Sequence, residues 1–193
     1  MTVTDVNVVK SAIFERPDDA NKGTLGSLLC VCGSYGMAGA AVMSAKGALR
    51  TGIGLAKCAL PRSIYPIVAQ TILESVYYPL SENADGRISK VNIPFLVSES
   101  CKSSSTLVGC GLGVCDDTLK IVFSLIENSA TPLVLDADAL NCVAKQPEIL
   151  LRKKAPIIIT PHPGEMSRLT GLATPLVNAE RERVALDFAQ KYG

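Results

Sequence analysis

Short runs of apolar residues alternate along the chain with longer stretches that have helical spacing. The apolar runs are nearly continuous and only a few residues long, so they predict strands that are buried on both faces. The amphipathic stretches between them predict helices, which would cover those faces. The pattern therefore predicts an α/β fold with a mostly parallel central sheet. The expected strands are 28–32, 54–58, 105–109, 132–136 and 156–160, with a further one at 72–77. The expected helices are 40–50, 116–128, 137–151 and 178–191, and 81–86 is expected to be a polar surface loop.

Length and charge narrow the class of protein. The chain has 193 residues, which fits one domain, and 48% of them are hydrophobic, enough to bury a sizeable core. Its formal charge is only +1, which argues against nucleic acid as a partner. No apolar run is long enough for a membrane-spanning helix, and residues 1–10 lack the features of a signal peptide. We therefore expect a cytoplasmic protein that binds neither nucleic acid nor membranes.

The cysteines predict no disulfide framework and no zinc site. Most of them lie inside apolar runs, where a thiol behaves as a small hydrophobe, so we expect reduced thiols. The sequence has no Cys-x-x-Cys motif, and His162 is its single histidine. A structural zinc site therefore lacks its ligands, and we assign no metal-ligating residue.

Ligands of a parallel sheet bind beyond the carboxyl ends of its strands, and two of the loops expected there are rich in glycine. Residues 33–41 carry the spacing G-x-x-G-x-x-G, and residues 109–113 carry glycine at alternate positions. Backbone N–H groups in such a loop could hold an anion at the start of a helix, although the first loop is equally consistent with a packing turn. The two loops together favour a phosphate-bearing or nucleotide-like ligand.

A third loop, residues 136–141, places two carboxylates and an amide after a buried strand. Asp136, Asp138 and Asn141 could orient a ligand hydroxyl or hold Mg²⁺ through water. Asp138 is equally consistent with a cap on the following helix.

A fourth loop, residues 160–165, frames His162 between two prolines, and Glu165 can begin the next helix. A lone histidine is more often a plain surface or core residue. The rigid frame at the end of a strand favours a ligand contact here, with the imidazole as a donor to a phosphate or hydroxyl.

In this order, the four loops resemble those of the ADP-dependent NAD(P)H-hydrate dehydratase family, a branch of the ribokinase-like fold. The likeness begins at residues 21–26 and continues through the fourth loop, so it covers nearly the whole chain. Its most specific part is the pairing of Asp-Ala-Asp-x-Leu-Asn with Pro-His-Pro-Gly-Glu. The resemblance implies a three-layer α/β/α architecture, with residues 1–193 in a single ribokinase-like domain.

The resemblance also implies an activity, the repair of NADH or NADPH whose nicotinamide ring has been hydrated. ADP, or ATP in some members, would act with Mg²⁺ to phosphorylate the ring hydroxyl, because phosphate is a better leaving group than hydroxide. By the same resemblance, Ala40, Gly113 and His162 would contact the hydrated cofactor. The other residues expected to line that substrate site are Gly39, Gly111, Asp136, Asp138 and Asn141.

The sequence departs from the family pattern at its C-terminal end. Family members continue past the position of Gly193 with a Lys-Gly nucleotide loop and a Gly-x-Gly-Asp motif, whose aspartate would be the base. Neither motif occurs here, so the catalytic residues stay unknown, and we expect a domain truncated at its C-terminus. A chain natively this short would keep the substrate half-site and lose phosphoryl transfer. Family members often assemble, and an open sheet edge would encourage association, so we expect a homo-oligomer.

Other functions stay open. A ribokinase-like kinase for a small alcohol would release a stable phosphorylated product, whereas a non-catalytic dinucleotide-binding module would bind the hydrate without turnover. A conventional NAD-dependent oxidoreductase is disfavoured, because both the G-x-G-x-x-G spacing and the ribose-binding acid are missing. The sequence does not distinguish NADH hydrate from NADPH hydrate, or ADP from ATP.

Overall fold

The computed structural model describes residues 18–193, so residues 1–10, where no signal peptide was expected, lie outside the described part. Within it, a single sheet has all its strands parallel, in the order β3-β2-β1-β4-β5-β6. This confirms the predicted parallel α/β architecture. The strands are β1 (Ser27–Val31), β2 (Leu55–Pro61), β3 (Val76–Leu80), β4 (Ser105–Val108), β5 (Leu133–Leu135) and β6 (Ile157–Ile159).

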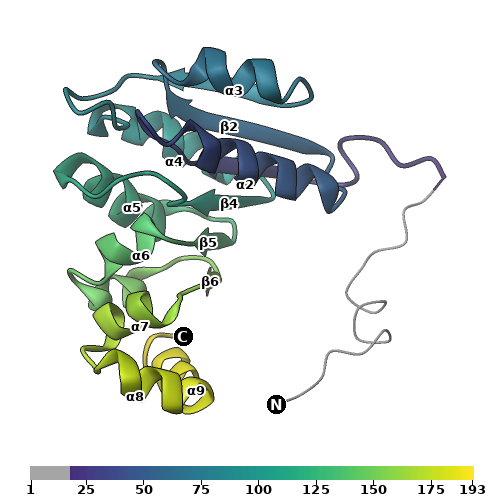
Figure 1. The fold of residues 1–193 in the computed structure, drawn as a ribbon. Coiled ribbons are helices and arrows are strands. Elements are labelled where there is room, and N and C mark those ends of the chain that lie inside the picture. Colours follow the sequence, from purple (N-terminus) through teal and green to yellow (C-terminus); the bar gives the residue numbers. More distant parts are fainter. Residues whose placement is uncertain (1–17) are drawn as a thin grey trace.

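Helices follow the strands and form a layer on each face of the sheet (Figure 1). They are α2 (Ala38–Arg50), α3 (Tyr65–Thr71), α4 (Ile93–Cys101), α5 (Asp116–Asn128), α6 (Asp138–Val143), α7 (Pro163–Thr170), α8 (Thr174–Ala179) and α9 (Arg181–Tyr192). Two 3₁₀ helices, η1 (Lys90–Asn92) and η2 (Pro147–Arg152), precede α4 and β6.

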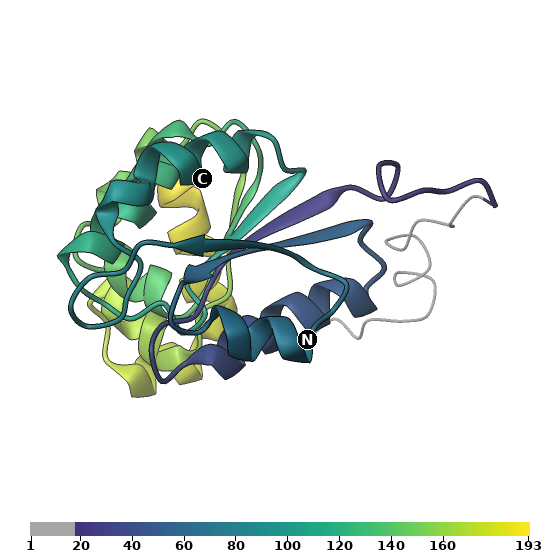
Figure 2. The ribbon, with the colours of Figure 1, turned by 90° about the horizontal axis from the view of Figure 1, so that it is seen from above.

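Two apolar cores lie on opposite faces of the sheet. In one, α2 and α3 pack on β1 and β2 around small side chains such as Ala45, Cys30 and Cys58. In the other, helices from α4 onward pack on the opposite face around larger side chains such as Leu125 and Leu135. Figure 2 shows the blue helices α2 and α3 on one side of the strands and the teal and green helices on the other.

The strands β4, β5 and β6 are not covered equally on their two faces. Leu107, Val134 and Ile158 stand in register on β4, β5 and β6, on the face of the sheet that carries α2. Leu107 and Val134 are half-buried, and Ile158 is 61% exposed. The residues on either side of Leu107 and Val134, such as Val108 and Leu135, face the second core and are fully buried.

Several predicted element boundaries were wrong. The helix expected at 137–151 is divided into α6 and η2, because Pro147 has no N–H to continue a helix. The helix expected from residue 178 begins at Arg181, after the separate helix α8, and the strand expected at 72–77 lies at Val76–Leu80. The sequence reading also missed α3 and α4. Each has proline in its first turn, a position that favours helix initiation.

The strand order positions the candidate site. β1 and β4 are neighbours, although β2 and β3 separate them along the chain. The chain leaves β1 for α2 on one face and leaves β4 for α5 on the other. A crevice opens where two such connections diverge, and it is the usual ligand position in open parallel sheets.

Candidate functional site

A hydrogen bond and a close contact hold together the first and second glycine loops, which follow β1 and β4. The Ser34 hydroxyl, which is buried, donates to the Gly111 carbonyl at 2.8 Å. A Cβ on Gly111 would lie 2.6 Å from the Ala40 Cβ, and the φ of +65° also requires glycine. The structure thus brings Ala40 and Gly111 into contact, as the shared site requires. Gly39 is exposed, and a Cβ placed on it would meet nothing within 4 Å.

The second loop is also tied to the third, which follows β5. The Gly113 N–H donates to Asp138 Oδ2 at 2.8 Å, and the Cys110 thiol donates to Asp136 Oδ2 at 3.4 Å. Asp138 makes no side-chain cap bond to α6, whose cap residue is Ala137. The capping role considered for Asp138 is therefore not observed, and its carboxylate holds the second loop instead.

Ala137 lies between the two aspartates in a strained conformation. Its φ is 50° and its ψ is −114°, and no other non-glycine residue in the described part of the chain has a positive φ. Such a conformation costs about 1–3 kcal/mol and persists only where the surroundings enforce it. Here both flanking carboxylates are held by other loops, so the strain accompanies a fixed orientation of Asp136 and Asp138.

The third loop is in turn tied to the fourth loop and to α7. The Thr160 hydroxyl donates to Asp136 Oδ1 at 2.9 Å. Arg168, on α7, donates from Nε to Asn141 Oδ1 at 2.8 Å, and Asn141 Nδ2 donates to Asp138 Oδ1 at 3.2 Å. Hydrogen bonds or direct contacts therefore join each of the four loops to the next.

His162 caps α7 and keeps an exposed ring. Its Nδ1 accepts from the Gly164 N–H at 3.0 Å, and its Nε2 lies 3.1 Å from Glu165 Oε1. Because Nδ1 accepts a hydrogen bond, the proton of the neutral ring lies on Nε2 and points at Glu165. Glu165 Oε2 also accepts from the His162 N–H at 2.9 Å, which completes a capping box. The side chain of His162 is 61% exposed, so a ligand can reach the ring.

Sequence reasoning missed two contributors to this region, Arg168 and the segment 81–89. Arg168 lies 27 positions from Asn141 in the sequence, and no local pattern predicts their contact. The segment 81–89, part of which was expected to be a polar surface loop, packs on the site. The Tyr35 N–H donates to the Gly86 carbonyl at 2.9 Å, and a Cβ on Gly113 would lie 2.4 Å from Arg87 Nε. By contrast, the spacing His162-x-x-Glu165 could have predicted the capping box.

The third loop does not supply a full set of Mg²⁺ ligands by itself. Among residues 18–193, no group of three or more histidine, cysteine or acidic side chains is placed to hold a metal ion. Protein donors already occupy both oxygens of Asp136 and both oxygens of Asp138. Mg²⁺ keeps several waters and commonly binds through substrate phosphates, so any ion needed here would depend on the nucleotide for most of its ligands.

The thiols of the described residues are free, and four of them, including Cys30 and Cys142, are buried. Burial raises the pKa of Cys142 to about 11 and the pKa of Cys30 further. These groups therefore stay protonated and unreactive at neutral pH, as expected of core thiols.

An apolar cavity lies beside the fourth loop, whose Pro161 forms part of its lining. The cavity, of about 260 Å³, separates β6 from α9 and is lined by side chains such as Ile157, Phe188 and Tyr192. None of the expected substrate residues lines it. In addition, no helix among residues 18–193 has the length and apolar character needed to cross a membrane.

Comparison with known proteins gives consistent matches over most of the chain. The profile of the NAD(P)H-hydrate dehydratase family matches residues 28–193. The bifunctional NAD(P)H-hydrate repair enzyme Nnr of Thermofilum pendens is 38% identical over 176 residues, which cover 91% of this chain and 34% of the relative. The chain thus spans about a third of that protein's length.

Solved structures support the fold as well. The ADP/ATP-dependent NAD(P)H-hydrate dehydratase of Bacillus subtilis, co-crystallised with ATP and Mg²⁺, superimposes with a TM-score of 0.76 at 26% identity. The match covers 96% of this chain and 62% of that one. A ribokinase-like superfamily protein of Enterococcus faecalis superimposes with a TM-score of 0.74 at 18% identity, over 94% of this chain and 60% of that one. Together with the two helical layers, these likenesses confirm the predicted ribokinase-like fold.

Proposed function

The chain belongs to the NAD(P)H-hydrate dehydratase family, and from that premise we propose that its four loops bind hydrated NADH or NADPH for ADP-dependent dehydration. The observation that carries the proposal is the continuous frame from Ala40 and Gly111 through Gly113 and the aspartates to the fourth loop. A frame of this kind holds a ligand's contacts in place before the ligand arrives, which lowers the cost of binding.

Each part of the frame suits one part of a dinucleotide. The glycine loops present bare backbone at the start of α2, which has no acidic residue in its first turn, so a phosphate group can approach it. Thr160 and Asp136 together offer a hydroxyl and a carboxylate to ribose or ring hydroxyls. His162 offers a ring N–H that can exchange Glu165 for a ligand oxygen.

In the proposed reaction, the hydroxyl oxygen on the hydrated ring attacks the terminal phosphorus of ADP, and AMP leaves. The ring nitrogen then donates its electron pair, the carbon–oxygen bond breaks, and inorganic phosphate departs with that bond's electrons. Loss of a proton from the neighbouring carbon restores the double bond of the reduced nicotinamide. The described residues would bind and orient the ring, and we assign the base to none of them.

Several finer features belong to the same proposal. ADP or ATP, with Mg²⁺, would be the co-substrate; the Bacillus subtilis relative was crystallised with ATP and Mg²⁺. The buried, reduced thiols are consistent with the reducing cytoplasm. The bare face at Ile158 on the edge strand β6 is consistent with a homo-oligomer. The common sheet and its two cores are consistent with one domain.

The test has a binding arm and a turnover arm. The purified chain is titrated with hydrated NADH, and the absorbance of reduced nicotinamide is then followed with Mg²⁺, in the presence and absence of ADP. We expect saturable binding and ADP-dependent recovery of absorbance. His162→Ala should weaken binding by about 10- to 100-fold, the loss of one strong hydrogen bond. Lys154→Ala, at an exposed residue outside the loops, is the control and should bind as the wild type does.

The other outcomes separate the competing functions. Binding without turnover at any ADP concentration would support a dinucleotide-binding module. A stable phosphate ester formed from a simple alcohol would support a small-alcohol kinase. A folded chain that does not bind hydrated NADH or NADPH would contradict the proposal.

A further inference from the structure

Three hydrogen bonds connect α7 to the second loop through α6. Arg168 donates to Asn141 at 2.8 Å, Asn141 donates to Asp138 at 3.2 Å, and the Gly113 N–H donates to the same carboxylate at 2.8 Å. We call these four residues the Arg168 chain. Its members come from α7, α6 and the second loop, which lie far apart in the sequence.

The chemistry of the Arg168 chain allows one arrangement of the Asn141 amide. A guanidinium only donates and a carboxylate only accepts, so the amide oxygen must face Arg168 and the amide nitrogen must face Asp138. Turning the amide over would break both bonds. Arg168 therefore fixes the orientation of Asn141, and Asn141 in turn presents an N–H to Asp138.

The Arg168 chain connects two of the predicted substrate contacts, Gly113 and the helix start at His162. Gly113 is one end, and Arg168 lies on the helix that His162 caps. The guanidinium also approaches that loop, because its Nη1 would be 3.8 Å from a Cβ placed on Gly164. The Arg168 chain thus sets the distance between the second loop and the start of α7.

We propose that Arg168 is a positioning residue, which acts through Asn141 and Asp138 to hold the Gly113 N–H and so fixes the second loop relative to His162. Arg168 is exposed, and an exposed polar contact of this kind contributes little to overall stability. Its loss should therefore loosen the second loop without unfolding the protein. The functional half of this inference rests on the proposed function, while the structural half does not.

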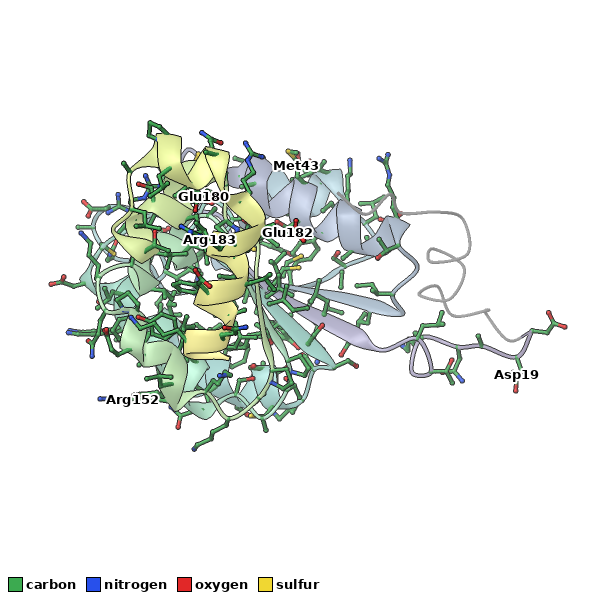
Figure 3. The ribbon with its side chains drawn as sticks, turned by 90° about the horizontal axis from the view of Figure 1, so that it is seen from below. Asp19, Met43, Arg152, Glu180, Glu182 and Arg183 are labelled. Carbon is green, nitrogen blue, oxygen red and sulfur yellow. The ribbon has the colours of Figure 1, made fainter. Side chains whose placement is uncertain are left out.

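The structural half is tested by hydrogen–deuterium exchange at the Gly113 amide, which needs no ligand. Arg168→Met removes the donor and keeps an unbranched apolar side chain, and Arg168→Lys restores a charged donor. The matched control is Arg152→Met, which removes an arginine that pairs with Glu127 at 2.9 Å and points outward from the surface (Figure 3). We expect exchange at Gly113 to accelerate about tenfold in Arg168→Met, less in Arg168→Lys, and not at all in Arg152→Met.

A double variant makes the test specific to the Arg168 chain. In Asp138→Ala, Gly113 has already lost its acceptor, so adding Arg168→Met should change the exchange rate of Gly113 no further. The inference would be overturned if the Gly113 amide of Arg168→Met exchanged at the wild-type rate. It would also be overturned if the effects of the two substitutions on that rate simply added in the double variant.

The functional half is tested by the dissociation constant for hydrated NADH. Arg168→Met should raise it about tenfold, the equivalent of one lost hydrogen bond, with an unchanged thermal midpoint, and Arg152→Met should not change it. Faster exchange at Gly113 with unchanged affinity would refute the positioning role. A wild-type chain that fails to bind would refute the proposed function instead, and the exchange experiment would still decide the structural half.

Discussion

Two polar clusters lie at opposite ends of the same sheet, and they differ in how completely they close on themselves. At the amino ends of β4 and β5, the Ser100 hydroxyl bonds to those of Thr106 at 2.9 Å and Ser129 at 2.7 Å. All three residues have no exposed surface. Thr131 completes this cluster through the Ser100 carbonyl, so every hydroxyl in it is satisfied inside the protein.

At the carboxyl ends, the Arg168 chain and the Asp136–Thr160 pair are also hydrogen-bonded, but they are open to solvent. Arg168, Thr160 and His162 are exposed, and both aspartates are half-buried. A closed cluster can only specify packing, because a ligand cannot reach it. An open one can exchange a hydrogen bond to the protein or to water for one to a ligand, so the comparison supports a packing role for the amino end and agrees with the proposed binding role of the carboxyl end.

The largest expected effect comes from crowding the carboxyl-end loops. In Gly109→Ala, the new Cβ would lie 1.9 Å from the Asp136 carbonyl oxygen and 2.7 Å from the Ala139 Cβ, at a φ of +124°. We expect the free energy of unfolding to fall by about 3–5 kcal/mol, because backbone atoms must move apart. Urea denaturation measures the loss, and a loss under about 1 kcal/mol would contradict the close approach of these loops.

A matched glycine substitution separates crowding from recognition. Gly39→Ala has open space around its Cβ and lies inside α2, so it should raise the free energy of unfolding by up to about 1 kcal/mol. Because the first loop is proposed to contact the hydrated cofactor, the same change should weaken binding of hydrated NADH despite the gain in stability.

The closed cluster should respond in the opposite sense, with lost stability and unchanged binding. Ser100→Ala leaves two buried hydroxyls, Thr106 and Ser129, with one partner fewer. We expect the free energy of unfolding to fall by about 1–3 kcal/mol in urea denaturation. The dissociation constant for hydrated NADH should not change. Weaker binding in the folded variant would show that the two ends of the sheet are coupled.

The smallest effect is a pH dependence at the amino end. A hydrogen bond from Lys102 at 3.0 Å, with help from Tyr78 and Lys57, holds the pKa of Glu99 below its ordinary value. A lowered folded-state pKa means that the stabilisation is present above the ordinary glutamate range and disappears as pH falls through the folded pKa. Glu99→Gln should therefore be less stable than the wild type at neutral pH. Thermal midpoints should converge in acid, and a constant difference across pH would contradict this.

How much the sequence could predict depended on how far apart in sequence the interacting residues lie. Most strands and the four loops follow from local patterns, such as the apolar run 157–159 and the proline-framed His162, and apart from the displaced β3 their positions are as expected. Missed features depend on contacts distant in sequence. Arg168 reaches Asn141 from another helix, and Arg87 reaches Gly113 from a segment that looks like an ordinary turn.

The two missed helices have a different cause. Helices such as α3 and α4 are short, and neither has an acidic residue in its first turn to mark its start. Their positions follow from packing on the sheet as much as from local propensity, which tertiary contacts readily override.

The left-handed backbone at Ala137 limits how this site can change over evolutionary time. A β-branched residue there would add a steric cost to a conformation that already strains alanine, whereas glycine would relieve it. Acceptable substitutions at position 137 are thus confined to the smallest residues. The relative orientation of the Asp136 and Asp138 side chains would therefore be preserved. A change in ligand specificity would have to come from the residues around the pair.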